Sequence, residues 1–428
     1  MKHPFGLAAY RSISAALSPL SGAFLRARAR GGKEDPARLG ERFGRTHAPR
    51  PPGQLVWLHG ASVGEARVLM QLVRALHEAR SDLHFLITTG TTTSAADVAA
   101  AALPRTIHQY APFDLSSAAT ARFIVHWRPN LAVFAESEFW PNMLLRTAHA
   151  RIPLALVNAR LSPRSIANWQ RFPESAARLL SSYDVLLAAD MVSAAGLEKL
   201  SGRRVEHVGN LKLAAPAPEP NKDLLQALRA EIGVRRVWLA ASTHDGEEEI
   251  ILAAHARLRE IWPDALLLLA PRHPARGAAI ASLADGAPRR SQDAPIGDAP
   301  IYVVDTMGEL GTFLALAPAT FMAGSLLPAL AGHNPIEPAK AGSAIVSGPH
   351  VRSFNDLYAA LHAAGAMRLA HDANAIAAAI GDLWTNDGAR AAQIEAAARL
   401  VDGGQSTLSA TVQRLLALLD RGGANAPA

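Results

Sequence analysis

The strongest constraint on the fold is a regular alternation between short apolar runs and stretches of helical periodicity. In the first half of the chain the apolar runs are 55–58, 83–88, 131–135, 154–158 and 185–189. The alternation starts again in the second half, with runs at 237–241, 265–270, 301–304, 320–323 and 344–347. Such a pattern predicts βαβ units, in which a mostly parallel sheet carries helices on both faces. We therefore expect an α/β protein with two doubly wound, Rossmann-like domains.

A proline-rich stretch, residues 210–221, separates the two series and has the composition of a linker. We expect a first domain over 36–212, a linker over 213–222, and a second domain over 223–428 that includes a C-terminal helix. In open α/β sheets, ligands bind outside the carboxyl ends of the strands, and ligand sites favour domain interfaces. The expected architecture is thus two domains that face each other across a ligand-binding cleft.

Several classes of function are disfavoured by what the sequence lacks. The chain has no cysteine, which excludes disulfides, thiolate–metal sites and a cysteine nucleophile. No GxGxxG follows the first strand and no GxxxxGK[ST] is present, which argues against a dinucleotide enzyme and a P-loop NTPase. No group of Asp, Glu and His residues has persuasive metal spacing, so we expect neither a metal nor a cofactor.

The positive charge of the chain favours anionic partners. The formal net charge is +6 and the pI is near 9.9. Within residues 1–35, an apolar segment from Phe5 to Leu25 is interrupted by Arg11 and Pro19 and followed by several basic residues. Two interpretations stay open for 1–35: an amphipathic anchor on an anionic membrane surface, or a soluble N-terminal helix. Nucleic acid is not an expected partner, because the basic residues lack the interleaved aromatics of a stacking platform.

The motif HGASVGEA, residues 59–66, follows the first apolar run and precedes a helical pattern. A glycine-containing turn before a helix usually presents backbone N–H groups to an anion, yet Glu65 places a carboxylate there. One interpretation is structural, because Ser62 and Glu65 have the spacing of a capping box. The other is functional, and it requires further residues to meet Glu65 in the same cleft.

Two further motifs of the first domain lie where strands end. The strand 131–135 runs directly into Glu136 and Glu138, which can be a pair of helix-capping acids or part of a site. The strand 154–158 leads into VNARLSPRS, which contains Arg160 and can grip a carboxylate or phosphate, or can form a solvated basic loop.

The second domain has comparable motifs at its strand ends. A phosphate could lie on the backbone amides near Ser242, and a glycine turn followed by Asn334 and Glu337 is suited to hydrogen-bonding sugar hydroxyls. A lone histidine at the position of His273, beside Arg272, is more often structural than catalytic.

Seven motifs, in this order, closely resemble the bacterial 3-deoxy-D-manno-octulosonic acid (Kdo) transferases. They are HGASVGEA, ESEFWPN, VNARLSPRS, VGNLK, PRHP, MGEL and GHNPIEPA. Each motif is weak alone, but seven in register are strong, and the similarity extends from residues 39–44 to the neighbourhood of Phe354.

The resemblance implies the two-domain GT-B fold, CMP-Kdo as donor and the glucosamine disaccharide precursor of lipid A as acceptor. It also implies inversion at the anomeric carbon without a bound metal. The location implied is the cytoplasmic face of the inner membrane, with peripheral attachment or a single N-terminal anchor. The number of Kdo units transferred does not follow from the resemblance.

The resemblance also assigns roles to residues. Glu65 matches the proposed general base of the family, and Glu138 is our second catalytic candidate. The residues assigned to the donor are Ser242, Arg272, His273, Met307, Gly308, Glu309, Asn334 and Glu337. Those assigned to the acceptor or to Kdo are Ser62, Gly64, Glu136, Arg160 and Lys212.

The residue types are compatible with this chemistry. An inverting transfer is a single displacement, so one carboxylate base suffices, and a monophosphate leaving group can be offset by an arginine and a helix N-terminus. Two alternatives remain: another GT-B enzyme, such as a UDP-sugar transferase or UDP-sugar 2-epimerase, and a basic membrane- or RNA-binding protein that has kept the fold.

Overall fold

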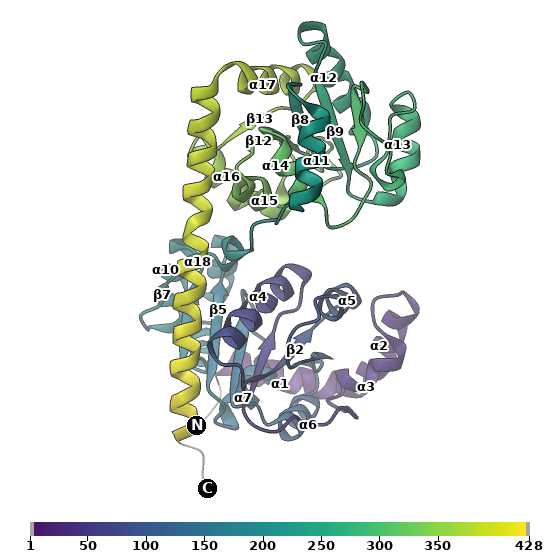
Figure 1. Cartoon of the computed structure of the whole chain (residues 1–428). Coiled ribbons are helices and arrows are strands. Elements are labelled where there is room, and N and C mark those ends of the chain that lie inside the picture. Colours follow the sequence, from purple (N-terminus) through teal and green to yellow (C-terminus); the bar gives the residue numbers. More distant parts are fainter. Residues whose placement is uncertain (1–3, 425–428) are drawn as a thin grey trace. The chain divides into compact units, whose positions relative to one another are not determined.

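The computed structural model describes residues 4–424, which fold into two compact units (Figure 1). The first unit contains residues Met1–Ala215 together with Gly403–Ala428, and the second contains Pro216–Asp402. The boundary at residue 215 falls inside the predicted linker. The division of the C-terminal helix, however, differs from the one expected from the sequence.

The first unit is built on a seven-stranded parallel sheet with the order β3-β2-β1-β4-β5-β6-β7. Its strands are β1 (Leu55–His59), β2 (His84–Thr89), β3 (Thr106–Tyr110), β4 (Leu131–Ala135), β5 (Leu154–Ala159), β6 (Val185–Ala188) and β7 (Glu206–His207). The helices that follow them are α4 (Val63–Ala79), α5 (Thr92–Ala100), α6 (Ser117–Trp127), α7 (Pro141–His149), α8 (Pro163–Trp169), α9 (Pro173–Leu180) and α10 (Met191–Ser201).

Both faces of this sheet are buried, which explains why its central strands are apolar at most positions. Successive residues of a strand point to opposite faces. Leu55 and Trp57 therefore pack in one cluster, with side chains from α6, α7, α9 and α10, while Val56 and Leu58 pack in another, with side chains from α4 and α5. All four of these β1 side chains are fully buried.

The second unit contains a six-stranded parallel sheet with the order β10-β9-β8-β11-β12-β13. Its strands are β8 (Val237–Thr243), β9 (Leu266–Pro271), β10 (Ile301–Val303), β11 (Ala319–Met322), β12 (Ala344–Ser347) and β13 (Met367–Leu369). Its helices are α11 (Lys222–Ile232), α12 (Glu248–Ile261), α13 (Gly277–Leu283), α14 (Leu310–Leu316), α15 (Ile336–Ala341), α16 (Asn355–Ala363) and α17 (Ala373–Thr385). The two parallel α/β sheets confirm the predicted fold class.

The long C-terminal helix α18 (Asp387–Ala424) belongs to both units. From Gly403 onward it packs on the first unit, where Leu415 and Leu419 enter the same apolar cluster as Val56. The Thr407 hydroxyl also donates a hydrogen bond of 2.7 Å to the carbonyl of Val208. The sequence interpretation placed the whole helix in the second domain, because helical periodicity shows that a face is apolar but not which partner buries it.

The N-terminal segment forms two helices, α1 (Phe5–Leu17) and α2 (Ser21–Arg30), followed by the short α3 (Leu39–Arg42). Helix α1 is attached to the first unit by the buried Leu7 and by Tyr10, whose hydroxyl donates to Asp114 over 2.7 Å. Asp114 also accepts from the backbone N–H groups of Asn142 and Met143, at the start of α7. Among residues 4–424, no helix combines the length and the apolar character needed to cross a membrane.

Candidate functional site

The topological switch point of the first unit lies between β1 and β4. From β1 the chain goes on to β2 on one side, whereas β4 leads to β5 on the other, so the strand order reverses between these neighbours. Ligands bind at such a switch point, outside the carboxyl ends of the strands. His59 is the last residue of β1, and Glu136 directly follows β4. The two motifs singled out in the sequence therefore meet at this edge.

Glu65 occupies the third position of helix α4 and completes a capping box. The Ser62 N–H donates to Glu65 Oε2 over 2.9 Å, and the Glu65 N–H donates to the Ser62 hydroxyl over 3.3 Å. Gly60 lets the chain pass close to this carboxylate, because a Cβ there would lie 2.7 Å from the Glu65 Cβ. The structural interpretation of Glu65 is thus correct, and it fixes where the carboxylate points.

Glu65 lies near further ionisable side chains that a helix cap does not require. Burial raises the pKa of Glu65, and the nearby carboxylates of Glu138 and Glu136 raise it further, while the Ser62 N–H and His59 act in the opposite direction. A carboxyl group with a raised pKa at the switch point of a parallel sheet is suited to accept a proton in a reaction. Three carboxylates from two separate motifs therefore form one electrostatic group.

Glu138 is held by a buried chain of hydrogen bonds that the sequence did not reveal. His59 Nε2 lies 3.0 Å from Glu138 Oε2, and His59 Nδ1 lies 2.9 Å from the Thr88 hydroxyl, which accepts from Trp57 Nε1 over 2.8 Å. The two ring nitrogens of His59 thus link the Glu138 carboxylate to the Thr88 hydroxyl. Trp140 Nε1 also donates to Glu138 Oε2. This carboxylate is therefore fixed in position.

Glu136 pairs with Lys212, whose Nζ lies 2.7 Å from Glu136 Oε1. Both Glu136 and Asn158 have positive φ values, 59° and 50°, and the Asn158 amide donates to Glu136 Oε1 over 3.4 Å. A Cβ added to Gly64 would lie 3.9 Å from Lys212 Nζ, so the ammonium group lies beside the first turn of α4. The VGNLK motif thus brings a cation to the three carboxylates.

Arg160 lies at the end of β5, at the same edge of the sheet. Its Nε is 3.7 Å from Asp190 Oδ2, and its carbonyl accepts a hydrogen bond from the Ser137 hydroxyl. The structure therefore brings Ser62, Gly64, Glu65, Glu136, Glu138 and Lys212 together, with Arg160 linked to them through Ser137. His59 is the residue that sequence reasoning missed, although its place at the end of a strand was a usable signal.

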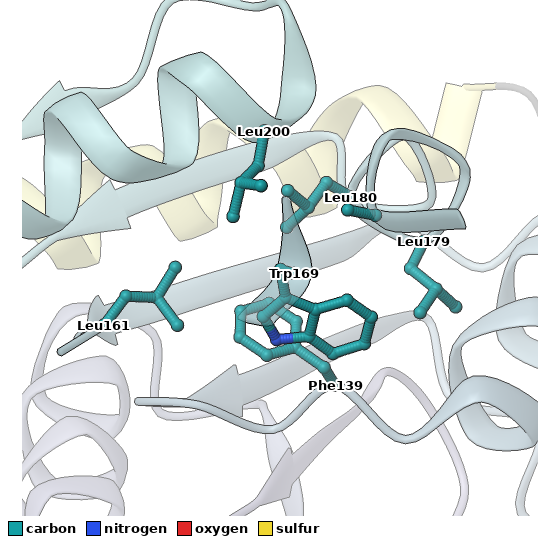
Figure 2. A pocket seen from close by; sticks show the side chains of 7 residues that line it. Phe139, Leu161, Trp169, Leu179, Leu180 and Leu200 are labelled. Atoms are coloured by element: carbon teal, nitrogen blue, oxygen red, sulfur yellow. The ribbon is translucent and has the colours of Figure 1, made fainter. Parts of the chain in front are cut away.

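An apolar cavity also lies in the first unit, at the edge formed by α8, α9 and α10 (Figure 2). Its seven lining residues are all apolar, and its volume of about 10 Å³ is close to that of one water-sized sphere. The rings of Phe139 and Trp169 meet edge to face within it, with centroids 5.9 Å apart. Because a sugar does not fit there, we assign this cavity to the core.

The second unit has the equivalent switch point between β8 and β11. Ser242, at the end of β8, has a positive φ of 61°. Five residues later the fully buried Glu247 accepts four backbone N–H bonds of 2.7–3.1 Å, from His244 and from residues 324–326. This carboxylate ties together the two loops at the carboxyl ends of β8 and β11. Sequence reasoning assigned no role to Glu247.

Histidines gather at this edge of the second sheet. His244 Nε2 lies 2.8 Å from His333 Nε2, with the two rings stacked, and the His273 ring lies edge-on to His244. Burial, together with the neighbouring His244 and Arg272, lowers the pKa of His333 to about 4. Burial also lowers the pKa of His244. The pair is therefore neutral at pH 7, while Arg272 is exposed and carries the positive charge of this edge.

The other predicted donor residues lie on two further loops. Met307 is 74% exposed and precedes Gly308, whose φ is 84°. Glu309 Oε1 accepts a hydrogen bond of 2.9 Å from Arg290 Nη2. Asn334 Oδ1 accepts from the Ile336 N–H over 3.2 Å, and Glu337 lies in the first turn of α15. Over the described part of the chain, no group of three or more His, Asp or Glu residues has a metal-binding arrangement.

Solved structures with a similar course of the chain include a UDP-GlcNAc 2-epimerase and a glycosyltransferase. UDP-GlcNAc 2-epimerase from Neisseria meningitidis, bound to UDP-GlcNAc, aligns with a TM-score of 0.56 and 13% identity over 85% of this chain and 100% of that one. A glycosyltransferase from Rickettsia africae aligns with a TM-score of 0.55 and 13% identity over 88% of this chain and 100% of that one. At these identities the likeness shows the fold, which is GT-B.

Sequence relatives identify the family. A family profile described as 3-Deoxy-D-manno-octulosonic-acid transferase (kdotransferase) matches residues 37–215. An Arabidopsis thaliana protein described as a probable mitochondrial 3-deoxy-D-manno-octulosonic acid transferase is 37% identical over 83% of this chain and 82% of its own length. The 3-deoxy-D-manno-octulosonic acid transferase of Haemophilus influenzae is 31% identical over 89% of this chain and 90% of its own length. The chain therefore belongs to the Kdo transferase family of glycosyltransferases.

Proposed function

We propose that this Kdo transferase moves Kdo from CMP-Kdo to the disaccharide precursor of lipid A, with inversion and without a metal ion. The observation that carries the proposal is the environment of Glu65, which combines a fixed orientation with a raised pKa. Glu65 Oε2 accepts the Ser62 N–H, so Oε1 is the oxygen available to take the proton of the acceptor hydroxyl. Loss of that proton makes the hydroxyl oxygen the nucleophile that displaces CMP from the anomeric carbon.

The other residues of the first unit support this step without taking part in it. His59 and Trp140 hold the Glu138 carboxylate, which raises the pKa of Glu65 toward the range useful for a base. Lys212, paired with Glu136, supplies a positive charge that suits the carboxylate of Kdo or a phosphate of the acceptor. We assign acceptor binding to this unit for these reasons.

We assign CMP-Kdo to the second unit. The leaving group carries one phosphate, whose charge Arg272 can offset. Neutral His244 and His333, stacked on each other, offer ring nitrogens for hydrogen bonds without adding charge. Asn334 and Glu337, at the start of α15, suit the hydroxyls of ribose. A monophosphate needs less charge compensation than a pyrophosphate, which is why the mechanism is proposed without a divalent ion.

We also propose that the enzyme works at the cytoplasmic face of the inner membrane, attached through α1 and α2. Phe5, Ile13 and Leu17 of α1 are 87%, 59% and 42% exposed, and basic residues occupy the last turn of α2. Apolar side chains beside cations favour the surface of an anionic bilayer.

Incubation of the purified chain with CMP-Kdo and the lipid A precursor, followed by mass spectrometry, tests the proposed reaction. The expected product is the precursor enlarged by one or more Kdo units, together with CMP. A parallel incubation with UDP-N-acetylglucosamine tests the remaining alternative. Turnover of that donor with no turnover of CMP-Kdo would overturn the proposal.

A further inference from the structure

The helix that follows β8 begins with two adjacent glutamates that take no part in the proposed reaction. Glu247 is the N-cap of α12 and Glu248 is its first residue, and both side chains are fully buried. Burying a carboxylate is costly unless donors satisfy its oxygens. The donors in this case lie at the carboxyl ends of β8, β9 and β11, the edge to which we assign CMP-Kdo.

The Glu247 carboxylate uses all of its acceptor capacity. Its Oε2 accepts from the N–H groups of His244 and Gly324, at 3.1 and 2.7 Å. Its Oε1 accepts from the N–H groups of Ser325 and Leu326, both at 2.9 Å. A carboxylate offers about four acceptor sites, two on each oxygen. Three consecutive amides of the loop after β11, a grouping that can bind a phosphate, are thus occupied by an internal anion and serve to place the loop.

Through these bonds Glu247 places both members of the stacked histidine pair. His244 is held by its own N–H group. His333 is held against Gly324, because a Cβ there would lie 2.5 Å from His333 Cδ2, and the Gly332 N–H donates to the Gly324 carbonyl over 2.8 Å. The distance of 2.8 Å between the two ring nitrogens therefore depends on one carboxylate that links the two loops.

Glu248 extends the same support to the loop after β9. Its Oε1 accepts from the Thr243 hydroxyl over 2.9 Å and from Arg276 Nη1 over 2.6 Å. Arg276 lies on the loop that begins with Arg272, whose N–H donates to the Thr243 carbonyl over 3.0 Å. The cation assigned to the donor phosphate is therefore on a loop that is tied to the start of α12.

We propose that Glu247 is a positioning residue for the donor: it fixes the spacing of His244 and His333 so that both rings bind CMP-Kdo. The inference rests on the proposed assignment of CMP-Kdo to the second unit. Glutamine cannot replace Glu247, because in either orientation of its amide the –NH2 group faces two backbone N–H donors. The substitution should therefore separate the two loops and weaken donor binding.

Steady-state kinetics and calorimetric titration with CMP test this proposal in the full chain. Glu247→Gln should raise the KM for CMP-Kdo and the Kd for CMP about 10-fold, the effect of losing one or two neutral hydrogen bonds to the donor. The KM for the lipid A precursor should not change. Glu249→Gln, the same substitution at the exposed neighbouring position, is the matched control and should behave like the wild type.

A purely structural role of Glu247 gives a different result. A variant that is only less stable loses kcat through a smaller folded fraction, while both KM values stay unchanged. That result, or a CMP affinity equal to that of Glu249→Gln, overturns the proposal. A wild type that does not bind CMP overturns the donor assignment itself and with it this inference, so the two failures are distinguishable.

Gly324→Ala tests the same link if Glu247→Gln does not fold. It retains the carboxylate, but the added Cβ has to displace the His333 ring, so the Kd for CMP should again rise. Alanine is also strained at the φ of 71° of this position, so a thermal melt must first show that Gly324→Ala is folded. Unchanged CMP binding in this folded variant overturns the proposal.

Discussion

At the scale of single residues, the capping role of Glu65 is compatible with its proposed role as the base. The capping box is present, so the carboxylate stabilises helix α4, and the same hydrogen bond from Ser62 holds it near the carboxylates of Glu138 and Glu136. A cap and a base are compatible because a carboxylate has two oxygens.

Replacing Glu65 with Gln separates the two roles. The Gln side chain still accepts from the Ser62 N–H, so the melting temperature should stay near that of the wild type. Gln cannot take a proton, so turnover should fall at least about 100-fold. Steady-state kinetics and thermal melts measure both quantities, with Glu78→Gln at the exposed end of the same helix as the control. A folded variant with near-normal turnover would contradict the assignment of Glu65 as the base and make Glu138 and Glu136 the next candidates.

The raised pKa of Glu65 predicts the pH dependence of the reaction. A base must be ionised, so turnover should rise with pH through the pKa of Glu65, above the ordinary range of a glutamate. The raised pKa also means that the folded state binds this proton more tightly than the unfolded state. Its contribution to stability is therefore present below the unfolded pKa and lost as pH rises through the folded pKa.

Glu138→Gln should move the acidic limb of the kcat profile to lower pH, because it removes the larger of the two carboxylate contributions to that shift. Arg204→Gln, distant in the sequence and exposed, should leave the limb in place. An unchanged limb in Glu138→Gln would show that the two carboxylates are not coupled in solution.

At the scale of elements, helix α1 carries two different surfaces. Leu7 and Tyr10 hold it to the first unit, while Ile13 and Leu17 face solvent. Deleting everything before Leu39 therefore removes buried contacts as well as exposed ones, and a loss of membrane binding in such a deletion would not be specific.

The double substitution Ile13→Ser/Leu17→Ser tests membrane attachment more cleanly. Ile13 and Leu17 are 59% and 42% exposed, so the melting temperature should change less than on replacement of a core residue, while flotation with anionic vesicles should weaken. Tyr10→Phe is the complementary control: it should lower the free energy of unfolding by about 1 kcal/mol and leave flotation unchanged. Unaltered flotation in Ile13→Ser/Leu17→Ser would move the membrane contact elsewhere on the first unit.

The second half of α18 should contribute to the stability of the first unit. Leu415 is fully buried against its sheet, so Leu415→Ala should lower the free energy of unfolding by about 2–5 kcal/mol. Gln413→Ala, on the exposed face of the same helix, should have little effect. Chemical denaturation measures both, and equal values for the two variants would contradict the packing described here.

The elements that were predicted and those that were missed differ in burial. All ten apolar runs form strands, because strands buried on both faces are apolar at every position. The strands not predicted are β3, β7 and β13, each at the edge of its sheet. Strand β3 has polar and partly exposed residues, and β7 and β13 have only two and three residues, so none produces a long apolar run.

A similar limit applies to the site. The carboxylates Glu65, Glu136 and Glu138 were predicted because they follow apolar runs, and the end of an apolar run can be recognised in the sequence. The partners of His59 and His244 lie 79 and 89 residues away, so those pairings exist only in the folded chain. The same holds for Glu247, whose four backbone donors come mainly from a loop more than 70 residues later.

At the scale of the whole molecule, the chemistry is expected to be independent of metal ions. The proposed leaving group is a monophosphate, and Glu65 supplies the base. Turnover should therefore be the same, within experimental error, before and after treatment with EDTA. A loss of activity in EDTA that magnesium or manganese restores would refute the metal-free mechanism.

The division of α18 has a consequence for synthesis of the protein. A ribosome releases the chain from its N-terminus, so the first sheet emerges about 190 residues before the helix that completes its apolar face. Until then, the surface around Val56 and Leu211 lacks the cover of Leu415 and Leu419 and invites chaperone binding or aggregation. The second unit, continuous in sequence, can finish folding first. We therefore expect nascent chains arrested before Gly403 to bind chaperones more strongly than the completed protein does.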